Sequence, residues 1–587
     1  PVKQWFALSS ADMEMSRSLY LVVLRKDIPS PLAKESDEEK GGEEKKAPEK
    51  EEPQSKKKDK KPEKKEAETK EIFSIDLDGL KYRILDLPVR AGAYFNLQTG
   101  NEGEIYYLEA PAGSRSSFAR ETKLMKFTLK ERKAEDILEG VNWFEVSADK
   151  KKILYMSRNT YGIIPAGPKA KPNQGRIETG AIEVRIEPRA EWKQIFYEAW
   201  RINRDFFYAA NMHGADWEAM KKKYEVFLPH LSCRSDLNRV IQWMCSELAV
   251  GHHRVGGGDF LAQPQRVPGG LLGADYAIEN GCYRFKKVYG GLNWNPELRS
   301  PLTEPGVDVK DGEYLLAVQG REIRAPENIY SVFENTAEKL VEITVGPNPD
   351  RRGSRTVQVV PLSNEYALRN RDWVEGNMNR VDEATNGRVA YVYVPNTSTL
   401  GHIYFKRYFF PQVNKEAIIV DERFNGGGLV ADYYIDLLRR PFVSYWHMRY
   451  GDDIKTPGGS IQGPEVMLIN ELAGSGGDLL PWMFRKFKLG KLIGKRTWGG
   501  LVGTLGFPVL MDGGYVTAPN LAIWTEDGWV VENVGVPPDI EVEQWPADVI
   551  AGKDPQLEKA IEVILEELEK NPPKKAKRPP YPVRIKK

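Results

Sequence analysis

One serine of the chain stands where a hydrolase would hold a nucleophile. Ser475 lies in the glycine-rich stretch 470–478, directly after the apolar run 466–469, and residues 479–487 have a helical apolar pattern. We therefore expect Ser475 on a sharp turn between a buried strand and a helix, with the amide of Gly476 facing a developing oxyanion. The turn alone is ambiguous, because a strand-to-helix loop with an idle serine has the same composition.

A second glycine-rich turn follows a second apolar strand, at 417–421, and leads into a helical pattern from about 430 to 438. Its three glycines in a row leave backbone amides free, so Gly427 or Gly428 could give the second donor of an oxyanion hole. Such a donor typically contributes ~3 to 4 kcal/mol of transition-state stabilisation. A phosphate-binding loop is a poor alternative, because no Lys followed by Ser or Thr comes after Gly428.

A serine nucleophile needs a base, and the chain has six histidines. His252 and His253 form a pair after a helical stretch at 237–248 and just before three glycines, 256–258. A histidine at a structured turn is more often a surface or capping residue than a catalytic one. The spacing of the Cys and His residues does not resemble a zinc site, so we expect neither a metal nor another cofactor.

From Pro188 onward the sequence resembles tricorn protease and its bacterial relatives, which are related to the carboxyl-terminal processing proteases. The matching stretches follow the family's order: 191–201, 204–208, 213–217, 247–252, 423–428, 470–478, 532–536 and 538–540. The resemblance implies a serine endopeptidase that hydrolyses unfolded polypeptides or oligopeptides through an acyl-enzyme on Ser475. It also implies His252 as the base and Glu532 as the acidic member that supports the base.

The same resemblance implies an oxyanion hole formed by the amides of Gly476 and of Gly427 or Gly428. One position departs from the family pattern. The archaeal enzymes have a serine immediately before the histidine, and here that position is Gly251. The hydroxyl that would connect Glu532 to His252 is then missing, or is supplied by water or by another side chain. His253 is a rival base, although the spacing after 247–248 favours His252.

The predicted fold is multidomain, ending in an α/β catalytic domain of the ClpP/crotonase type. We expect partial β-propeller blades at 1–165 with a disordered charged insertion at 34–70, a helical subdomain with the catalytic histidine at 185–262, a PDZ-like domain at 263–366, the catalytic domain at 367–550, and a C-terminal helix with a basic tail at 551–587. The PDZ-like part either captures extended peptides or only spaces the catalytic halves, and the sequence leaves both interpretations open.

The first 165 residues hold too few strands for a closed propeller, which needs at least four blades. Together with Pro1 in place of an initiator methionine, this predicts that further propeller segments lie elsewhere and that exposed strand edges favour association. The insertion at 34–70 consists largely of Lys, Glu, Pro and Asp, and such a segment cannot bury enough apolar surface to offset its ordering entropy.

Composition argues against some kinds of binding partner and indicates a cellular compartment. A formal net charge of +1 argues against a chain built to bind nucleic acid, and no stretch is long enough to span a membrane. Three cysteines without a pattern fit a reducing compartment, so we expect a cytoplasmic protein, with a periplasmic or secreted location left open. Family resemblance implies a homo-oligomer, a hexamer in the archaeal enzyme, and suggests downstream aminopeptidases as partners.

Two other functions remain open at this stage. Acyl-CoA chemistry on a crotonase-like fold also uses glycine-rich oxyanion loops, and it would not need Ser475. A catalytically weak or inactive peptide-binding scaffold is suggested by Gly251. Covalent labelling by a fluorophosphonate separates both from a serine peptidase.

Overall fold

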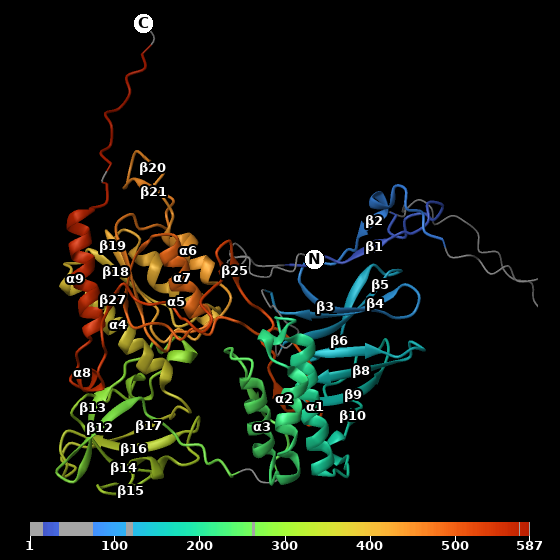
Figure 1. Ribbon diagram of the computed structural model, residues 1–587, viewed down its shortest axis with the longest axis horizontal. Helices are drawn as coiled ribbons and strands as arrows, with labels where there is room; N and C mark the ends of the chain where they lie inside the picture. Colours follow the sequence, from blue (N-terminus) through green and yellow to red (C-terminus); the bar gives the residue numbers. More distant parts are fainter. Residues whose placement is uncertain (1–15, 34–73, 113–120, 261–263, 575, 586–587) are drawn as a thin grey trace, which may run out of the picture. The chain divides into compact units, whose positions relative to one another are not determined.

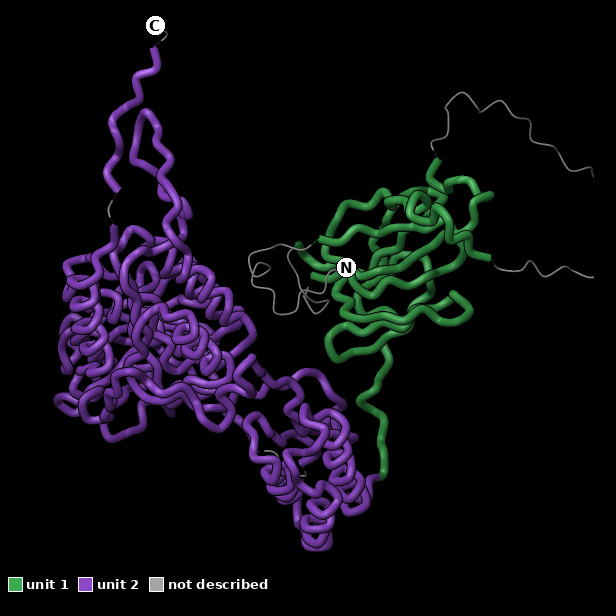
Figure 2. Tube along the Cα trace, turned by 45° about the horizontal axis from the view of Figure 1, so that its top comes forward, with its two compact units in different colours: residues 1–5, 12–185 green, residues 6–11, 186–587 purple. Residues whose placement is uncertain are grey.

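The computed structural model describes residues 16–33, 74–112, 121–260, 264–574 and 576–585. The predicted insertion at 34–70 lies outside the described residues. The described chain forms two compact units, one up to Arg185 and the other from Ile186 onward, drawn in green and purple in Figure 2. The catalytic candidates all belong to the second unit.

Antiparallel sheets make up the first unit. The first four-stranded sheet contains β3 (Ala93–Thr99), β4 (Glu104–Ala110), β5 (Lys123–Thr128) and β6 (Lys133–Glu139), the second contains β7 (Trp143–Val146), β8 (Lys152–Ser157), β9 (Thr160–Pro165) and β10 (Arg176–Ile177), and β1 (Tyr20–Val22) pairs with β2 (Ile84–Asp86). Tyr106, Phe144 and Ile153 share one core between the two larger sheets. Consecutive four-stranded meanders are the unit from which propeller blades are built.

Three helices open the second unit: α1 (Pro188–Phe206), α2 (Trp217–Glu225) and α3 (Arg234–Ser246). Their shared core is completed by a segment far along the chain, which contributes Leu510, Val516 and Ala518. There β11 (Val255–Gly256) pairs with β24 (Tyr515–Val516), and the buried Arg234 guanidinium binds the buried Asp512 carboxylate at 2.6 Å. This pairing holds the stretch that carries His252 and His253 against the catalytic part of the chain.

The next part is an antiparallel sheet in the order β12-β13-β14-β16-β17. Its strands are β12 (Ala274–Glu279), β13 (Cys282–Val288), β14 (Tyr314–Val318), β15 (Arg321–Glu322), β16 (Val341–Gly346) and β17 (Arg355–Val359), with the short 3-10 helix η9 (Ile329–Phe333). In its opening loop the Leu271 amide donates to the Leu362 carbonyl at 2.8 Å, and the Gly273 amide donates to Glu365 Oε2 at 2.9 Å. Both amides are thus used within the chain, which favours a spacing role for this part over capture of a peptide carboxylate.

A five-stranded parallel sheet forms the core of the catalytic part, in the order β18-β19-β22-β23-β27. The strands are β18 (Val389–Tyr393), β19 (Ala417–Asp421), β22 (Glu465–Ile469), β23 (Gly490–Gly494) and β27 (Ile540–Glu541). The first three are buried along their whole length, as expected for a parallel sheet with helices on both faces. The predicted fold class, with PDZ-like and α/β parts, is confirmed.

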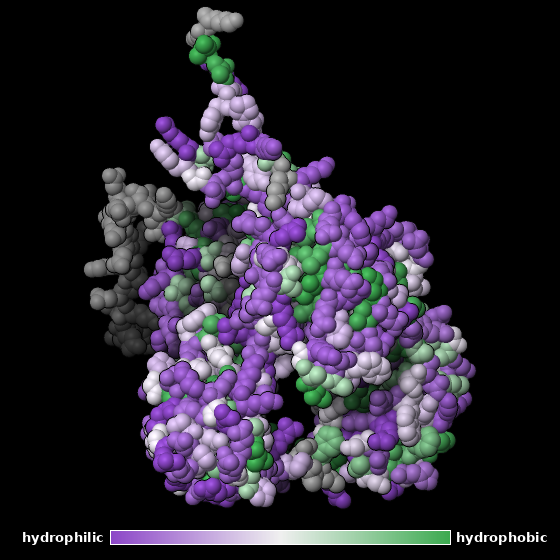
Figure 3. Space-filling view, turned by 90° about the vertical axis from the view of Figure 1, so that its left-hand side faces the viewer, coloured by the Kyte–Doolittle hydropathy of each residue, from purple (hydrophilic) through white to green (hydrophobic). Residues whose placement is uncertain are grey.

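Helices flank this sheet (Figure 1). They are α4 (Tyr366–Ala384), α5 (Thr399–Phe409), α6 (Ala431–Leu438), α7 (Gly476–Lys486) and α9 (Pro555–Lys570). This part of the chain also contains the short helix α8 (Pro546–Ile550) and the short strands β20 (Ser444–Trp446), β21 (Ile454–Thr456), β25 (Trp524–Thr525) and β26 (Gly528–Trp529). Helix α9 packs across β19, β22 and β23 through an apolar stripe that includes Leu557 and Ile564. The molecular face in Figure 3 is mostly hydrophilic, with scattered apolar areas.

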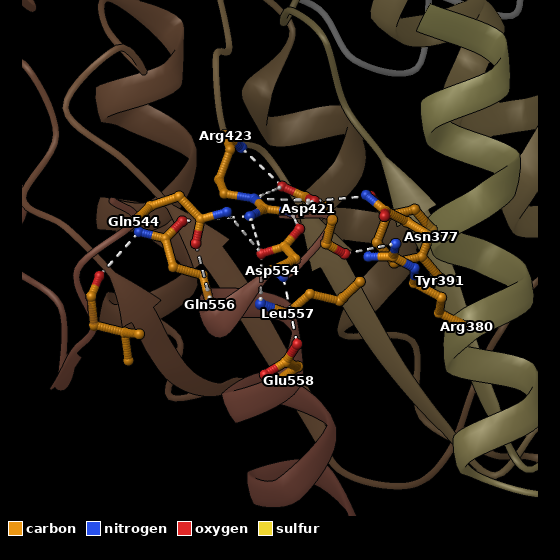
Figure 4. Close-up of polar contacts among 12 residues, drawn as sticks. Asn377, Arg380, Tyr391, Asp421, Arg423, Gln544, Asp554, Gln556, Leu557 and Glu558 are labelled. Atoms are coloured by element: carbon orange, nitrogen blue, oxygen red, sulfur yellow. Dashed lines mark hydrogen bonds and ion pairs between the residues drawn. The ribbon is translucent and has the colours of Figure 1, made fainter. Parts of the chain in front are cut away.

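A buried ion network fixes the end of β19, just before the second glycine-rich turn (Figure 4). The Arg423 guanidinium, 2% exposed, binds Asp421 at 2.7 Å and Asp554 at 2.8 Å. Tyr391 donates its hydroxyl to Asp421 at 2.7 Å. Since Asp554 is the N-cap residue of α9, this network ties the turn to the helix that covers the sheet.

We expect Arg423→Ala to lower the free energy of unfolding by about 3 to 5 kcal/mol, because it leaves two carboxylates buried without their cation. Arg439→Ala is the matched control. Arg439 pairs with Asp436 on the surface, where both side chains are about half exposed, so its loss should cost less than ~1 kcal/mol. Urea unfolding of both variants measures the difference, and equal losses would contradict a structural role for the buried network.

Candidate active site

Ser475 lies on the turn between β22 and α7, as the sequence predicts. Its backbone has φ 59° and ψ −117°, a conformation that a residue with a side chain rarely adopts. Holding a non-glycine residue in such a region costs of order 1 to 3 kcal/mol, and residues of this kind cluster at functional sites. Ser475 is therefore presented at the N-terminus of α7 by a strained turn.

The two glycine-rich turns lie against each other. A Cβ added at Gly427 would come within 2.6 Å of Ser475 Cβ, and one added at Gly476 would come within 2.8 Å of the Gly428 nitrogen. Larger residues would separate the turns. Gly427 and Gly428 also have φ values of 84° and 137°, which glycine adopts most readily.

The backbone amides of these glycines differ in whether they donate a hydrogen bond. The Gly427 amide donates to Asn425 Oδ1 at 2.9 Å. In the described part of the chain, the amides of Gly428 and Gly476 donate no hydrogen bond. A pair of unpartnered amides beside a serine hydroxyl is the arrangement that binds a developing oxyanion.

Two asparagines hold the turns in register. Asn470 Oδ1 accepts the amide of Phe424 at 2.9 Å, and the Asn425 carbonyl accepts the amide of Gly474 at 3.1 Å. Each bond runs from one turn to the other. The carboxyl ends of β19 and β22 are thereby connected where an α/β sheet places its ligands.

The carboxylate of Asp478 is the centre of the site, although no role was assigned to it from the sequence. It accepts the amide of Ser475 at 2.8 Å, the amides of Gly499 and Gly500 at 2.8 and 3.1 Å, and the hydroxyl of Thr497 at 2.5 Å. Burial raises the pKa of the Asp478 carboxyl group, whereas the four hydrogen-bond donors act to lower it. Asp478 thus fixes both the nucleophile turn and the loop 497–500.

A second acidic side chain nearby was also missed. Glu422 is fully buried, and its carboxyl oxygens have no hydrogen-bond partner in the part of the chain that the structure describes. Burial, with the charges of Asp478 and Asp421, raises the pKa of Glu422 well above its usual range. The neutral carboxyl is therefore the favoured form. Its only sequence signal is a position next to Arg423, which is too weak to find it.

His252 lies against Trp498, which also lies beside the turn that carries Ser475. The His252 ring centroid lies 5.3 Å from that of Trp498, and a Cβ at Gly474, next to Ser475, would touch the same indole at 2.6 Å. The Trp498 amide also donates to the Ala473 carbonyl at 2.9 Å. Trp498 thus borders both the histidine and the serine turn.

The imidazole of His252 is half-buried, and its Nδ1 has no hydrogen-bond partner among the described residues. The pKa of His252 is lowered, first by burial and then by the positive charge of Arg254. The negative charges of Glu532 and Asp478 act in the opposite direction. The backbone on either side is anchored, since Thr517 Oγ1 donates to the His252 carbonyl at 2.5 Å. The ring is therefore biased toward its neutral form.

His253 faces another way. Its Nε2 lies 2.9 Å from Asn203 Oδ1 in α1, and its ring stacks on Phe207 at 6.1 Å. Burial lowers its pKa to about 4. His253 thus belongs to the helical core, whereas His252 faces the loop that carries Trp498.

Glu532 binds backbone amides. Its Oε1 accepts the amide of Gly251 at 2.6 Å, and its Oε2 accepts the amides of Leu501 and Val502, both at 2.7 Å. A Cβ at Gly251 would lie 3.2 Å from the same Oε1, within the space where a serine side chain would stand. The carboxylate thus joins the loop before His252 to the loop after Gly500 without an intervening hydroxyl.

Other site types find no support in the described residues. No group of three or more His, Cys, Asp or Glu side chains is placed to hold a metal ion there. Within the same residues, no helix combines the length and the apolar character needed to cross a membrane. Cys233, Cys245 and Cys282 are free thiols, of which Cys233 is exposed.

Comparisons with known proteins agree with this architecture. Three family models match consecutive parts of the chain: the tricorn protease C1 domain at 188–246, the tricorn protease PDZ domain at 270–364 and peptidase family S41 at 388–542. Tricorn protease homolog 1 of Streptomyces coelicolor is 34% identical over 523 residues, which is 86% of this chain and 48% of that protein.

The tricorn protease of Thermoplasma acidophilum is 33% identical over 84% of this chain and 45% of its own length. A crystal structure of the tricorn protease superimposes with a TM-score of 0.78 at 31% identity, covering 85% of this chain and 49% of that one. The chain belongs to the tricorn protease family. This confirms the family predicted from the sequence, and the tricorn-family chain spans about half the length of the relatives it matches.

We expect Asp478→Asn to destabilise the tricorn-family chain by about 2 to 4 kcal/mol, because an amide places an NH₂ group against buried N–H donors. Glu422→Gln is the control at a neighbouring buried carboxyl group that accepts no hydrogen bond from the described residues. It should change the free energy of unfolding by no more than ~1 kcal/mol. Urea unfolding compares the two, and a larger loss for Glu422→Gln would contradict the central role of Asp478.

Proposed function

We propose that the chain is a serine endopeptidase of the tricorn type, with Ser475 as the nucleophile. One observation carries the proposal: Ser475 stands on a strained turn beside the unpartnered amides of Gly428 and Gly476. A hydroxyl so placed can attack a carbonyl carbon while the amides receive the charge that develops on the carbonyl oxygen. The match to peptidase family S41 at 388–542 supports peptide hydrolysis as the reaction.

In this proposal, peptide hydrolysis depends on transfer of the Ser475 hydroxyl proton to and from His252. His252 accepts the hydroxyl proton as Ser475 Oγ forms a bond to the substrate carbonyl, which gives a tetrahedral anion held by the two amides. His252 next gives the proton to the leaving amine, and the peptide bond breaks to leave an acyl-enzyme on Ser475. A water molecule then attacks the acyl carbon and gives a proton to His252. His252 returns that proton to Ser475 Oγ as the ester bond breaks, which releases the acid and restores the serine hydroxyl.

Glu532 acts in this proposal through position and charge. Its carboxylate holds the amide of Gly251, so it fixes the backbone that presents His252. Its negative charge favours the imidazolium that forms during each transfer. The hydroxyl that the family pattern places between acid and base is therefore not required for Glu532 to support His252.

Two alternatives are less well supported. Acyl-CoA chemistry would not need the strained serine, and the family models matched by the chain describe a protease and a peptidase. A peptide-binding scaffold would need a free groove, yet the amides of the loop at Leu271 and Gly273 are occupied within the chain.

We further propose peptides or unfolded polypeptides as substrates, a homo-oligomeric assembly as in the archaeal family members, and cytoplasmic location. Free thiols at Cys233, Cys245 and Cys282 support a reducing compartment. Sedimentation of the purified chain tests the assembly, and a stable monomer would argue against it.

Labelling with a small fluorophosphonate tests the nucleophile. We expect an adduct on Ser475, none in Ser475→Ala, and loss of nearly all peptide hydrolysis in that variant. His252→Ala should be as severe, because the hydroxyl then lacks its base. His253→Gln is the matched control in the adjacent residue and should keep most activity if the variant folds. An unlabelled parent, or equal loss in both histidine variants, would contradict the assignment.

The pH dependence of peptide hydrolysis tests the base. His252 must be neutral to accept a proton, and burial lowers its pKa below the ordinary value of 6.5. Activity should therefore rise through an apparent pKa below 6.5 and be fully developed at neutral pH. A profile of kcat/KM from pH 4 to 9 measures this limb. A midpoint above 7 would mean that another group controls the reaction.

A further inference from the structure

A cavity of about 270 Å³ opens directly beside the proposed nucleophile. Ser475, Gly476 and Gly428 are among its lining residues, so the cavity borders both the serine and the residues that carry the two unpartnered amides. Its remaining lining residues are Leu429, Leu479, Gly503, Leu501, Leu521 and Ile523. The cavity is thus a continuation of the reaction site and has an almost wholly aliphatic wall.

The wall is held by the same elements that build the site. Leu479 lies four residues after Ser475 on α7, and residues at this spacing share one face of a helix. Leu501 follows Gly500, whose amide Asp478 accepts, and the Leu501 amide is itself held by Glu532. The shape of the cavity is therefore coupled to the loops that fix the reacting groups.

The opposite wall is closed by backbone pairing. The Gly503 amide donates to the Leu521 carbonyl at 2.7 Å, and the Leu521 amide donates back to the Gly503 carbonyl at 3.2 Å. This antiparallel bridge fixes the main chain from which the Leu521 side chain projects. A preformed wall of this kind can select among side chains without first having to order itself.

The lining has a definite chemistry. None of the described residues that line the cavity carries a charged side chain. A charged side chain entering it would lose its hydration without gaining an ion pair, whereas an aliphatic or aromatic one would gain from leaving water. A dry cavity of ~150 Å³ accepts a benzene ring, so 270 Å³ is enough for Leu, Met or Phe.

We propose that this cavity binds the side chain of the residue whose carbonyl is attacked, and that it selects Leu, Met or Phe at that position. The side chain next to the attacked carbonyl is the one that can enter a cavity bordered by nucleophile and oxyanion amides together. The inference rests on the proposed function, and it assigns to Leu479 and Leu521 the role of specificity-determining residues.

The first experiment uses fluorogenic peptides that differ only in this residue. Substrates with Leu, Phe, Ala, Lys or Asp there are compared by kcat/KM with the intact chain. We expect Leu and Phe to exceed Lys and Asp by at least ~10-fold, because a contact of this kind typically changes the specificity ratio by ~10- to 200-fold. A preference for Lys or Asp, or a flat profile, would overturn the proposal.

Variants of the wall then test the residues. Leu479→Asp places a carboxylate on the cavity wall and should shift preference toward Lys by at least ~10-fold relative to Leu. Leu521→Trp fills the cavity and should reduce Phe cleavage more than Ala cleavage. Leu340→Asp is the matched control, since Leu340 is exposed, does not line the cavity and lies in the PDZ-like part. It should leave the profile unchanged.

Fluorophosphonate labelling of Ser475 is read in parallel, because the small probe does not depend on the cavity. An unlabelled parent would mean that the proposed function fails. A labelled parent without the expected preference would mean that only the subsite assignment fails. Should Leu479→Asp lose labelling through misfolding, Leu521→Trp still decides the matter, and equal loss of Phe and Ala cleavage in a labelled Leu521→Trp would count against the proposal.

Discussion

The buried carboxylate of Asp478 is the constraint on which the site depends. It takes four donors from two separate stretches of chain, the turn at Ser475 and the loop 497–500. A carboxylate can stay ionised in such a place only while those donors remain. The strain at Ser475 and the approach of Trp498 to His252 are both held by this one group, and the wall of the adjoining cavity begins one residue beyond Gly500.

Much of this arrangement could be predicted from the sequence. The apolar runs at 417–421 and 466–469 identify buried parallel strands, because each is short, continuous and followed by glycines. The spaced family motifs then select His252, Ser475 and Glu532 among many candidates. The family and the fold class are confirmed, whereas the domain bounds and the catalytic roles of these residues stay predictions until they are tested.

Other features could not be found in this way, because they depend on contacts between residues far apart. Asp478 and Glu422 look like ordinary acidic residues in the sequence. Both are fully buried, and only their contacts distinguish a carboxylate with four donors from a carboxyl group with none among the described residues. Nor does the sequence indicate that the Gly427 amide donates its hydrogen bond to Asn425 Oδ1. Likewise, Glu532 bonds to amides of Gly251, Leu501 and Val502, and a one-dimensional pattern does not contain such bonds.

The pairing of the α3 region with a distant segment has a consequence for synthesis on the ribosome. Arg234 and Asp512 are 278 residues apart, and Leu510, Val516 and Ala518 complete the core beneath the two histidines. At about 5 to 20 residues per second, translation of that interval takes roughly 15 to 55 seconds. During this time His252 has been made but its surroundings have not. The nascent chain therefore emerges before the segment that completes this core has been made, and also before Glu532, which binds the Gly251 amide.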